Sequence, residues 1–281
     1  MIKLLVDSSS DFSQEEIKKK NMAYVPVSIH LEDKDYLDGI DLRIDDFYEL
    51  LLTASDFPKT SQPSPQDFLD HFEAAKKNRD QVICLLISTA VSGTCQSAKQ
   101  ARDMADYDGI YIVDTLNATA SIRLLAEVAF RMMAEGESAP AIVDALEVLK
   151  KRVRILASVD TLEYLWRGGR LGRTGAVIGE LANIKPVITV TAEGKVSLIS
   201  KCIGKNKALS YLIRYVKEHT PDPAFPLYTV YSYGAENCEA LEARLTKEGQ
   251  TFMKRCQIGP TIGAHVGPGA CGICYVESVA Q

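Results

Sequence analysis

Apolar runs that alternate with helical segments in the first half of the chain constrain the fold most strongly. The expected strands are IKLLV (residues 2–6), QVICLLIS (81–88) and GIYIVD (109–114). A helical segment follows each, opening with the capping box at Ser13–Glu16 and then covering about 93–105 and 118–134. Strands that are apolar throughout are buried on both faces. This half is therefore predicted to be a parallel sheet covered by helices.

The pattern changes near Arg152. VRILASV (153–159) is followed by a glycine-rich helical piece (161–184), and KPVITV, AEGK and VSLIS (185–200) then read as a β-hairpin. Two further helices alternate with LYTVYSY (227–233) and FMKRCQIG (252–259). At 281 residues the chain exceeds one usual core. We expect an α/β protein with an N-terminal domain at 1–152 and a C-terminal domain at 153–281, the latter with a mixed or antiparallel sheet.

Small polar residues follow each of the three expected parallel strands. They are DSSSD (7–11), STAVSGT (88–94) and DTLNATA (114–120). Ligands of parallel sheets bind at the carboxyl ends of the strands, and helix N-termini there attract anions. These exits are expected to line one rim. A further stretch, PKTSQPSP (58–65), is expected to start a helix at Ser64 and Pro65, and it brings Thr60 and Ser61 near as candidates.

A glycine- and proline-rich segment near the C-terminus, IGPTIGAHVGPGACGICYV (258–276), contains one histidine, His265. Glycine allows a backbone to pass close to another group and proline fixes its path. The segment is therefore interpreted as a loop that lies against a ligand. By itself the histidine is as often structural as functional.

Composition excludes several classes of protein. The net charge is −5, which disfavours nucleic-acid binding. No apolar run approaches a membrane span, and the N-terminus turns polar too early for a signal peptide, so a cytoplasmic protein without stable membrane insertion is expected. The seven cysteines are odd in number and lie mostly in apolar runs, which favours reduced, packed thiols. The Cys271–Cys274 spacing lacks a second pair of metal ligands.

Enzyme motifs are weak. A Ser/His hydrolase could be built from Ser92 and His265, but the sequence has no Gly-x-Ser-x-Gly elbow and no identifiable orienting acid. It also has no phosphate-binding Gly-x-x-x-x-Gly-Lys-Ser/Thr loop, and its histidines are not spaced as metal ligands. The residues offer ligands for an anion without a nucleophile.

A run from Lys195 to Lys217 without acidic residues reads as a solvated basic face or as a docking surface for an acidic partner or a phosphate.

Seven motifs in a fixed order connect these features. They are VDSSSDFS, YLDGIDL, PKTSQPSP, ISTAVSGTCQSA, VDTLNATA, DTLEYLWRGGRLG and IGPTIGAHVGPGACGI. Together they span nearly the whole chain, which resembles the DegV family of bacterial fatty-acid-binding proteins. The departures are small: Val6 stands where threonine is usual, and Cys95 where an aromatic residue is common.

The resemblance implies a long-chain fatty acid held in a tunnel between two domains, with no cofactor and no catalytic residue in this chain. Its carboxylate would be bound by Thr60, Ser61, Ser92, Gly93 and His265. Arg170 would lie near this head group, and a separate ATP-dependent fatty acid kinase would make acyl phosphate from the bound acid for phospholipid synthesis. From the charge pattern we expect Lys201, Lys205 and Lys207, with Arg170 and Arg173, to form the docking face for that kinase or to hold the phosphate of the product.

Two alternatives remain open from the sequence. One is a Ser/His acyl hydrolase or transferase, and the other is a carrier or sensor of another amphipathic acid. The residues that line such a tunnel cannot be told from ordinary core residues in the sequence.

Overall fold

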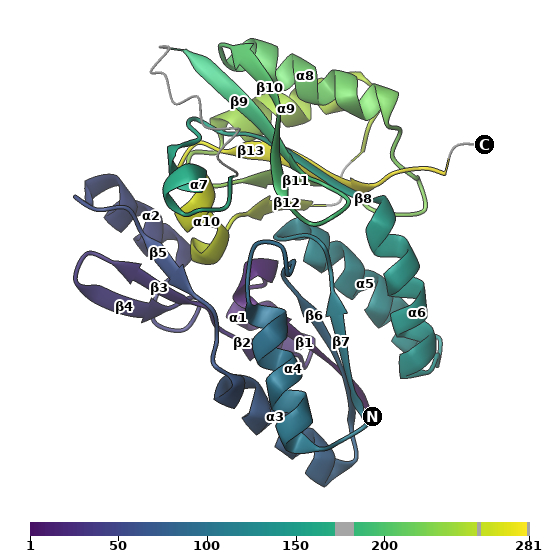
Figure 1. Cartoon of the computed structure of the whole chain (residues 1–281). Coiled ribbons are helices and arrows are strands. Elements are labelled where there is room, and N and C mark those ends of the chain that lie inside the picture. Colours follow the sequence, from purple (N-terminus) through teal and green to yellow (C-terminus); the bar gives the residue numbers. More distant parts are fainter. Residues whose placement is uncertain (172–182, 252–253, 280–281) are drawn as a thin grey trace.

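A computed structural model describes residues 1–171, 183–251 and 254–279 of the chain, which form two main β-sheets stacked with helices (Figure 1). The first sheet has the order β2-β1-β6-β7 and all its neighbouring pairs are parallel. Its strands are β1 (Ile2–Asp7), β2 (Ala23–Val25), β6 (Gln81–Leu86) and β7 (Ile110–Asp114). The predicted parallel sheet is confirmed.

Helices cover both faces of the first sheet because its strands alternate apolar side chains between the two faces. Leu4 and Val6 of β1 belong to the cluster under α5 and α6, whereas Leu5 belongs to the cluster under α3 and α4. The helices are α1 (Gln14–Lys19), α3 (Pro65–Asn78), α4 (Thr94–Ala105), α5 (Ala120–Ala134) and α6 (Ala139–Leu149), with short 3₁₀ turns η1 (Ser8–Ser10) and η2 (Lys150–Arg152). The predicted caps at Ser13 and Ser64 are present as complete capping boxes.

The second sheet has the order β10-β9-β8-β13-β11-β12, and its pairs are antiparallel except for β11 with β12. Its strands are β8 (Val153–Ser158), β9 (Ile184–Val190), β10 (Val196–Ile203), β11 (Tyr228–Tyr231), β12 (Lys254–Gln257) and β13 (Cys271–Val276). Helices α8 (Lys205–Glu218) and α9 (Glu236–Lys247) pack on one face. The opposite face turns toward the first sheet (Figure 1). The predicted mixed sheet is thus confirmed.

A third, small antiparallel sheet was not predicted from the sequence. It has the order β4-β3-β5 and lies beside helix α2 (Ile44–Thr53). Its strands are β3 (Ser28–Leu31), β4 (Lys34–Leu37) and β5 (Lys59–Ser61). With three or four residues each, they are too short to show a clear alternation of apolar side chains.

Two further expectations on the second half need comment. Helix α7 (Glu163–Arg167) lies in the predicted glycine-rich helical piece, of which 172–182 lie outside the described residues. The largest apolar cluster runs without interruption from β1 and α5 to β8 and β13. The proposed boundary at Arg152 stays a prediction.

Candidate functional site

A cavity of about 420 Å³ lies between the carboxyl edge of the first sheet and the inner face of the second. Its floor is formed by apolar side chains of the second sheet, namely Ile155, Ala157, Ile188, Val190, Val196 and Val230. Polar residues on its other walls come from the loops after β6 and β7, from β5 and from helix α10 (Pro260–Val266). Its size and mostly apolar lining with a few converging polar groups are typical of a small-molecule site.

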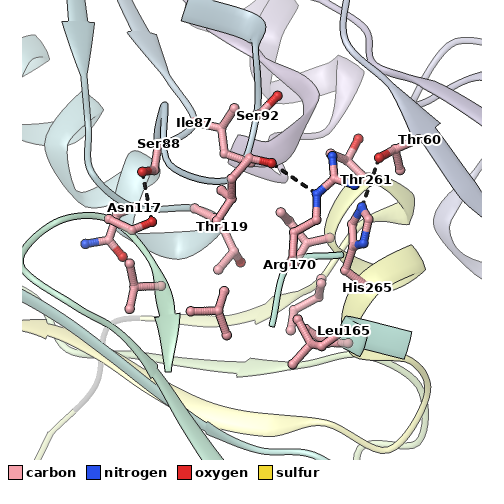
Figure 2. Close-up of a pocket in the computed structure, with 18 of the residues that line it drawn as sticks. Thr60, Ile87, Ser88, Ser92, Asn117, Thr119, Leu165, Arg170, Thr261 and His265 are labelled. Atoms are coloured by element: carbon pink, nitrogen blue, oxygen red, sulfur yellow. Dashed lines mark hydrogen bonds between the residues drawn. The ribbon is translucent and has the colours of Figure 1, made fainter. Parts of the chain in front are cut away.

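One end of the cavity gathers hydrogen-bonding groups from four separate segments. Thr60 and Ser61 come from β5, Ser92 precedes α4, Arg170 follows α7, and His265 lies on α10. In Figure 2, Thr60, Arg170 and His265 lie together on one side of the pocket. Ser61 is exposed, whereas His265 is buried, so this end reaches the protein surface.

Among the residues that the structure describes, Arg170 is the charged group of this end. Its Nε donates to the Val91 carbonyl at 3.1 Å and its Nη1 to the Gly168 carbonyl at 2.6 Å. Among the described residues, no carboxylate pairs with this guanidinium, which is partly buried. Burial lowers its pKa, because removing water disfavours the charged form. The arginine is fixed by carbonyl groups and keeps further N–H groups for an anion.

His265 is held as a neutral imidazole. Burial, with the nearby positive charge of Arg170 as the smaller cause, lowers its pKa to about 4. Its Nε2 and the Thr60 hydroxyl lie 2.9 Å apart in a hydrogen bond, and its Nδ1 is buried without a partner among the described residues. Gly168 lies against this ring, and a Cβ there would come within 2.3 Å of Nδ1. The glycine of the Arg-Gly-Gly-Arg stretch therefore leaves room for the histidine.

The predicted loop around His265 is wrong for residues 260–266, which form helix α10. Glycine serves close packing here: a Cβ at Gly263 would come within 2.6 Å of the Tyr48 hydroxyl and 2.8 Å of Phe47. The Tyr48 hydroxyl donates to the Ile258 carbonyl just before the helix. The glycines thus let a buried helix bring the histidine to the cavity.

Buried carboxyl groups hold the start of α10. Asp38 accepts hydrogen bonds from the backbone N–H and the hydroxyl of Thr261, at 2.9 and 2.5 Å, and Asp11 accepts from the Gly259 N–H. The Thr261 hydroxyl is also 2.7 Å from that of Ser8. Burial raises the pKa of Asp38, and likewise that of Asp11, to about 7, although these hydrogen bonds lower it. The DSSSD exit, expected to line the rim, is instead buried and supports the helix that carries His265.

The N-terminus of helix α4 closes the polar end. Gly93 is its N-cap, and the Ser92 hydroxyl lies 2.8 Å from that of Thr94 and accepts a hydrogen bond from the Thr94 N–H. Gln62 of the β5–α3 segment donates to Ser97 of the same helix at 2.9 Å. Strand β5 is thereby docked on α4, and this contact places Thr60 and Ser61 beside the helix N-terminus.

The loops after β6 and β7 form a second, deeper part of the cavity. Ser88, Asn117 and Thr119 line it and are all buried. The Ser88 hydroxyl donates to the Gly194 carbonyl of the β9–β10 turn at 2.9 Å. Figure 2 shows Ser88 and Asn117 on the side of the pocket opposite to His265 and Thr60.

The structure brings six of the nine predicted site residues to one cavity. They are Thr60, Ser61, Ser92, Gly93, Arg170 and His265. Arg173 lies outside the described residues. Lys201 on β10 and Lys205 at the start of α8 are exposed and do not line the cavity. The same holds for Lys207 on α8. Sequence reasoning missed Gln62, Asn117 and Thr261, although each lies within a motif that it singled out.

The arrangement does not assemble a Ser/His catalytic pair. Ser92 bonds to Thr94, His265 bonds to Thr60, and no acid in the part of the chain that the structure describes orients Nδ1 of the histidine. Within the described ranges, no three His, Cys, Asp or Glu side chains are grouped as metal ligands. None of the described helices is long and apolar enough to cross a membrane. All seven cysteines are free and buried, as predicted.

Comparison with known proteins gives one consistent family. A model described as "Uncharacterised protein, DegV family" matches residues 1–278. A DegV domain-containing protein of Caldanaerobacter subterraneus is 36% identical over 278 residues, which cover 98% of this chain and 99% of the relative.

Solved structures agree over the same length. A fatty-acid-binding DegV family protein from Thermus thermophilus is 29% identical with a TM-score of 0.88, covering 99% of each chain. A stearic-acid-binding protein from Eubacterium ventriosum is 28% identical with a TM-score of 0.89, covering 99% of this chain and 98% of that one. On this evidence the chain belongs to the DegV family.

Proposed function

We propose that this chain binds a long-chain fatty acid in the cavity between the two main sheets, with the carboxylate at the Arg170–His265 end. The observation that carries the proposal is Arg170, a partly buried cation without a described acidic partner, at one end of a mostly apolar cavity. Solved relatives that bind fatty acids support it.

The two parts of the cavity would contribute differently to binding. Each buried methylene group of the tail contributes about 0.8 kcal/mol, so the apolar floor would supply most of the affinity. An ionised carboxylate must find donors when it leaves water. Arg170, the Ser92 hydroxyl and the α4 N-terminus at Gly93 would provide them, with Thr60, Ser61 and neutral His265 beside them.

The finer proposal is that the bound acid is presented to a separate ATP-dependent fatty acid kinase, and that this chain itself is not catalytic. The polar end fits this role because it reaches the surface at Ser61. The separation of Ser92 from His265 by their own hydrogen bonds also argues for binding without turnover.

Mass spectrometry of the denatured protein, followed by titration with palmitate, tests the binding function. We expect a released fatty acid of mass matching a long acyl chain. Arg170→Gln should weaken palmitate binding about tenfold or more, since a hydrogen bond to a charged group contributes about 1.5–3 kcal/mol.

Arg167→Gln is the matched control, because Arg167 lies on the same segment but is exposed and pairs with Glu163. It should bind palmitate as the unchanged protein does. A protein that is purified without lipid and does not bind palmitate would contradict the proposal, as would equal affinities of the two variants.

A further inference from the structure

The β9–β10 turn, residues 191–195, closes the buried end of the cavity. Gly194 of this turn lines the cavity together with Ser88 and is itself buried. Glu193 and Lys195, on either side of Gly194, are exposed. A single turn of the chain therefore separates this end of the cavity from solvent.

One side-chain hydrogen bond attaches the turn to the first half of the chain. The Ser88 hydroxyl donates to the Gly194 carbonyl at 2.9 Å, as the dashed line at Ser88 in Figure 2 marks. Among the described residues, no other hydrogen bond joins 191–195 to the loops after β6 and β7. Ser88 is fully buried, and its own N–H donates to the Asn117 carbonyl at 2.9 Å. The bond to the turn is thus shielded from water, and its donor is held in place.

Close packing also fixes the turn. Gly194 has a φ of 76°, in the left-handed region, and a Cβ on it would come within 2.0 Å of the Ser88 Oγ and 3.3 Å of the Leu116 Cα. The Leu116 backbone is held by its N–H, which donates to Asp114 at 2.9 Å. Glycine therefore lets the turn lie directly against the loops after β6 and β7, and this contact forms the end wall of the cavity.

We propose that Ser88 and Gly194 set the longest acyl chain that the cavity accepts, by holding the β9–β10 turn as a wall against the end of the tail. The side chains before and after the turn, Val190 and Val196, line the cavity and are apolar, as the methyl end of a fatty acid requires. This inference deepens the proposed function and rests on it, since it takes the carboxylate to lie at the Arg170 end.

The wall affects each added carbon according to whether that carbon fits. A methylene group that fits inside the apolar cavity should tighten binding about fourfold. A chain that is too long would have to push the turn toward solvent and break the hydrogen bond between Ser88 and Gly194, which would weaken binding about fivefold. Affinity should therefore rise with chain length up to a limit and fall beyond it.

A mixture of saturated, unbranched fatty acids tests this limit. The unchanged protein and its variants are incubated with equal amounts of laurate, myristate, palmitate, stearate, arachidate and behenate, and the acids that each protein retains are quantified by mass spectrometry. Ser88→Ala removes the hydrogen bond to the turn. Gly194→Ala keeps the serine but forces it and the turn apart.

Each variant has a matched control away from the cavity. Ser210→Ala removes a hydroxyl that donates to the Asn206 carbonyl on α8, also at 2.9 Å. Gly249→Ala adds a Cβ at a φ of 75° in open space after α9, so it brings similar backbone strain without a contact.

The unchanged protein and both controls should retain one preferred length and much less of the next longer acid. In Ser88→Ala and in Gly194→Ala, the ratio of that longer acid to the preferred one should rise about fivefold or more. Circular dichroism identifies a variant that does not fold, and the other variant then decides.

A ratio that stays unchanged in the folded variants overturns the inference, and so does an equal rise in the controls. Retention by the unchanged protein that keeps increasing up to behenate overturns it as well. Binding of palmitate in those cases leaves the proposed function standing, whereas binding of no acid at all contradicts both.

Discussion

At the scale of single residues, the neutral state of His265 decides what the polar end can do. Because its pKa is lowered to about 4, the imidazole carries no charge at neutral pH, and Arg170 is the cation of that end. A neutral histidine that is hydrogen-bonded to Thr60 holds this hydroxyl in place and adds no positive charge to attract an anionic ligand. Arg170 therefore supplies the positive charge of this end, and His265 supplies hydrogen-bond geometry.

This state makes a prediction about stability. The unfolded histidine takes up a proton near its ordinary pKa of 6.5, whereas the folded one does not until about pH 4. Stability should thus fall as the pH falls from 6.5 toward 4, by about 2 kcal/mol at pH 5 from this group. His265→Gln should remove that contribution, so its stability relative to the unchanged protein should improve from pH 8 to pH 5 in urea unfolding.

His30→Gln is the control, since His30 is exposed on β3. Between pH 8 and pH 5, the stability of His30→Gln relative to the unchanged protein should not improve as that of His265→Gln does. If His265→Gln shows the same difference in unfolding free energy at both pH values, His265 is not held neutral by burial.

At the scale of elements, the position of helix α10 depends on two buried carboxyl groups that are distant from it in the sequence. Asp38 follows the small sheet and Asp11 follows η1, yet both receive hydrogen bonds from the start of α10. The helix is too short for its own propensity to hold it in water, so these contacts and its packing on Tyr48 must fix it. The position of His265 is therefore set by the N-terminal half of the chain.

Asp38→Asn tests this attachment through pH. The folded pKa of about 7 lies above the ordinary 3.8, so the folded state holds more protons between these values, and stability is lost as pH rises through 7. An asparagine oxygen can still accept from Thr261 and does not ionise. The melting temperature of the variant relative to the unchanged protein should rise from pH 5 to pH 8, by about 2 °C or more for each 1 kcal/mol.

Asp33→Asn, which changes an exposed carboxylate in the β3–β4 turn, provides the comparison. Its relative melting temperature should stay constant over this range. A relative melting temperature of Asp38→Asn that is flat or falls with pH would show that Asp38 is already ionised at low pH.

How much could be predicted differs between elements for physical reasons. Long apolar runs such as β6 and capped helices such as α3 are specified locally, and the sequence predicts them correctly. Strand β5 has three residues and is defined by pairing with β3, which no local pattern shows. In the same way, Ser92 and His265 follow from motifs, whereas the place of Asn117 in the cavity wall depends on how the loops after β6 and β7 meet the second sheet.

At the scale of the whole molecule, the two ends of the cavity differ in access. The Arg170 end reaches the surface at Ser61 of β5, and the end at Ser88 and Asn117 is buried between the sheets. A fatty acid held as proposed would keep its tail from water while its head group stays close to solvent. A partner could then reach the carboxylate without removing the tail.

We propose that the basic run at residues 195–217 forms the docking face for such a partner. Burial raises the pKa of the Cys271 thiol to about 12, and the positive charge of Lys205, at the start of α8, partly opposes this rise. Lys205 therefore lies close to Cys271. Cys271 opens β13 shortly after α10, so Lys205 lies at the same end of the second sheet as the helix that bears His265. The protein carries a net charge of −5, so an exposed basic patch here would favour one docking orientation.

Charge reversal tests this docking face with a recombinant ATP-dependent fatty acid kinase. The double variant Lys201→Glu and Lys205→Glu should bind palmitate normally, because neither lysine lines the cavity, but should lower kcat/KM for acyl-phosphate formation about tenfold or more. The control Lys19→Glu and Lys77→Glu makes the same change in net charge on exposed lysines of α1 and α3. Added salt should slow the unchanged protein and its control more than the Lys201–Lys205 variant, since screening acts on charges that the variant has lost. Equal turnover by the two double variants would place the kinase contact elsewhere on the molecule.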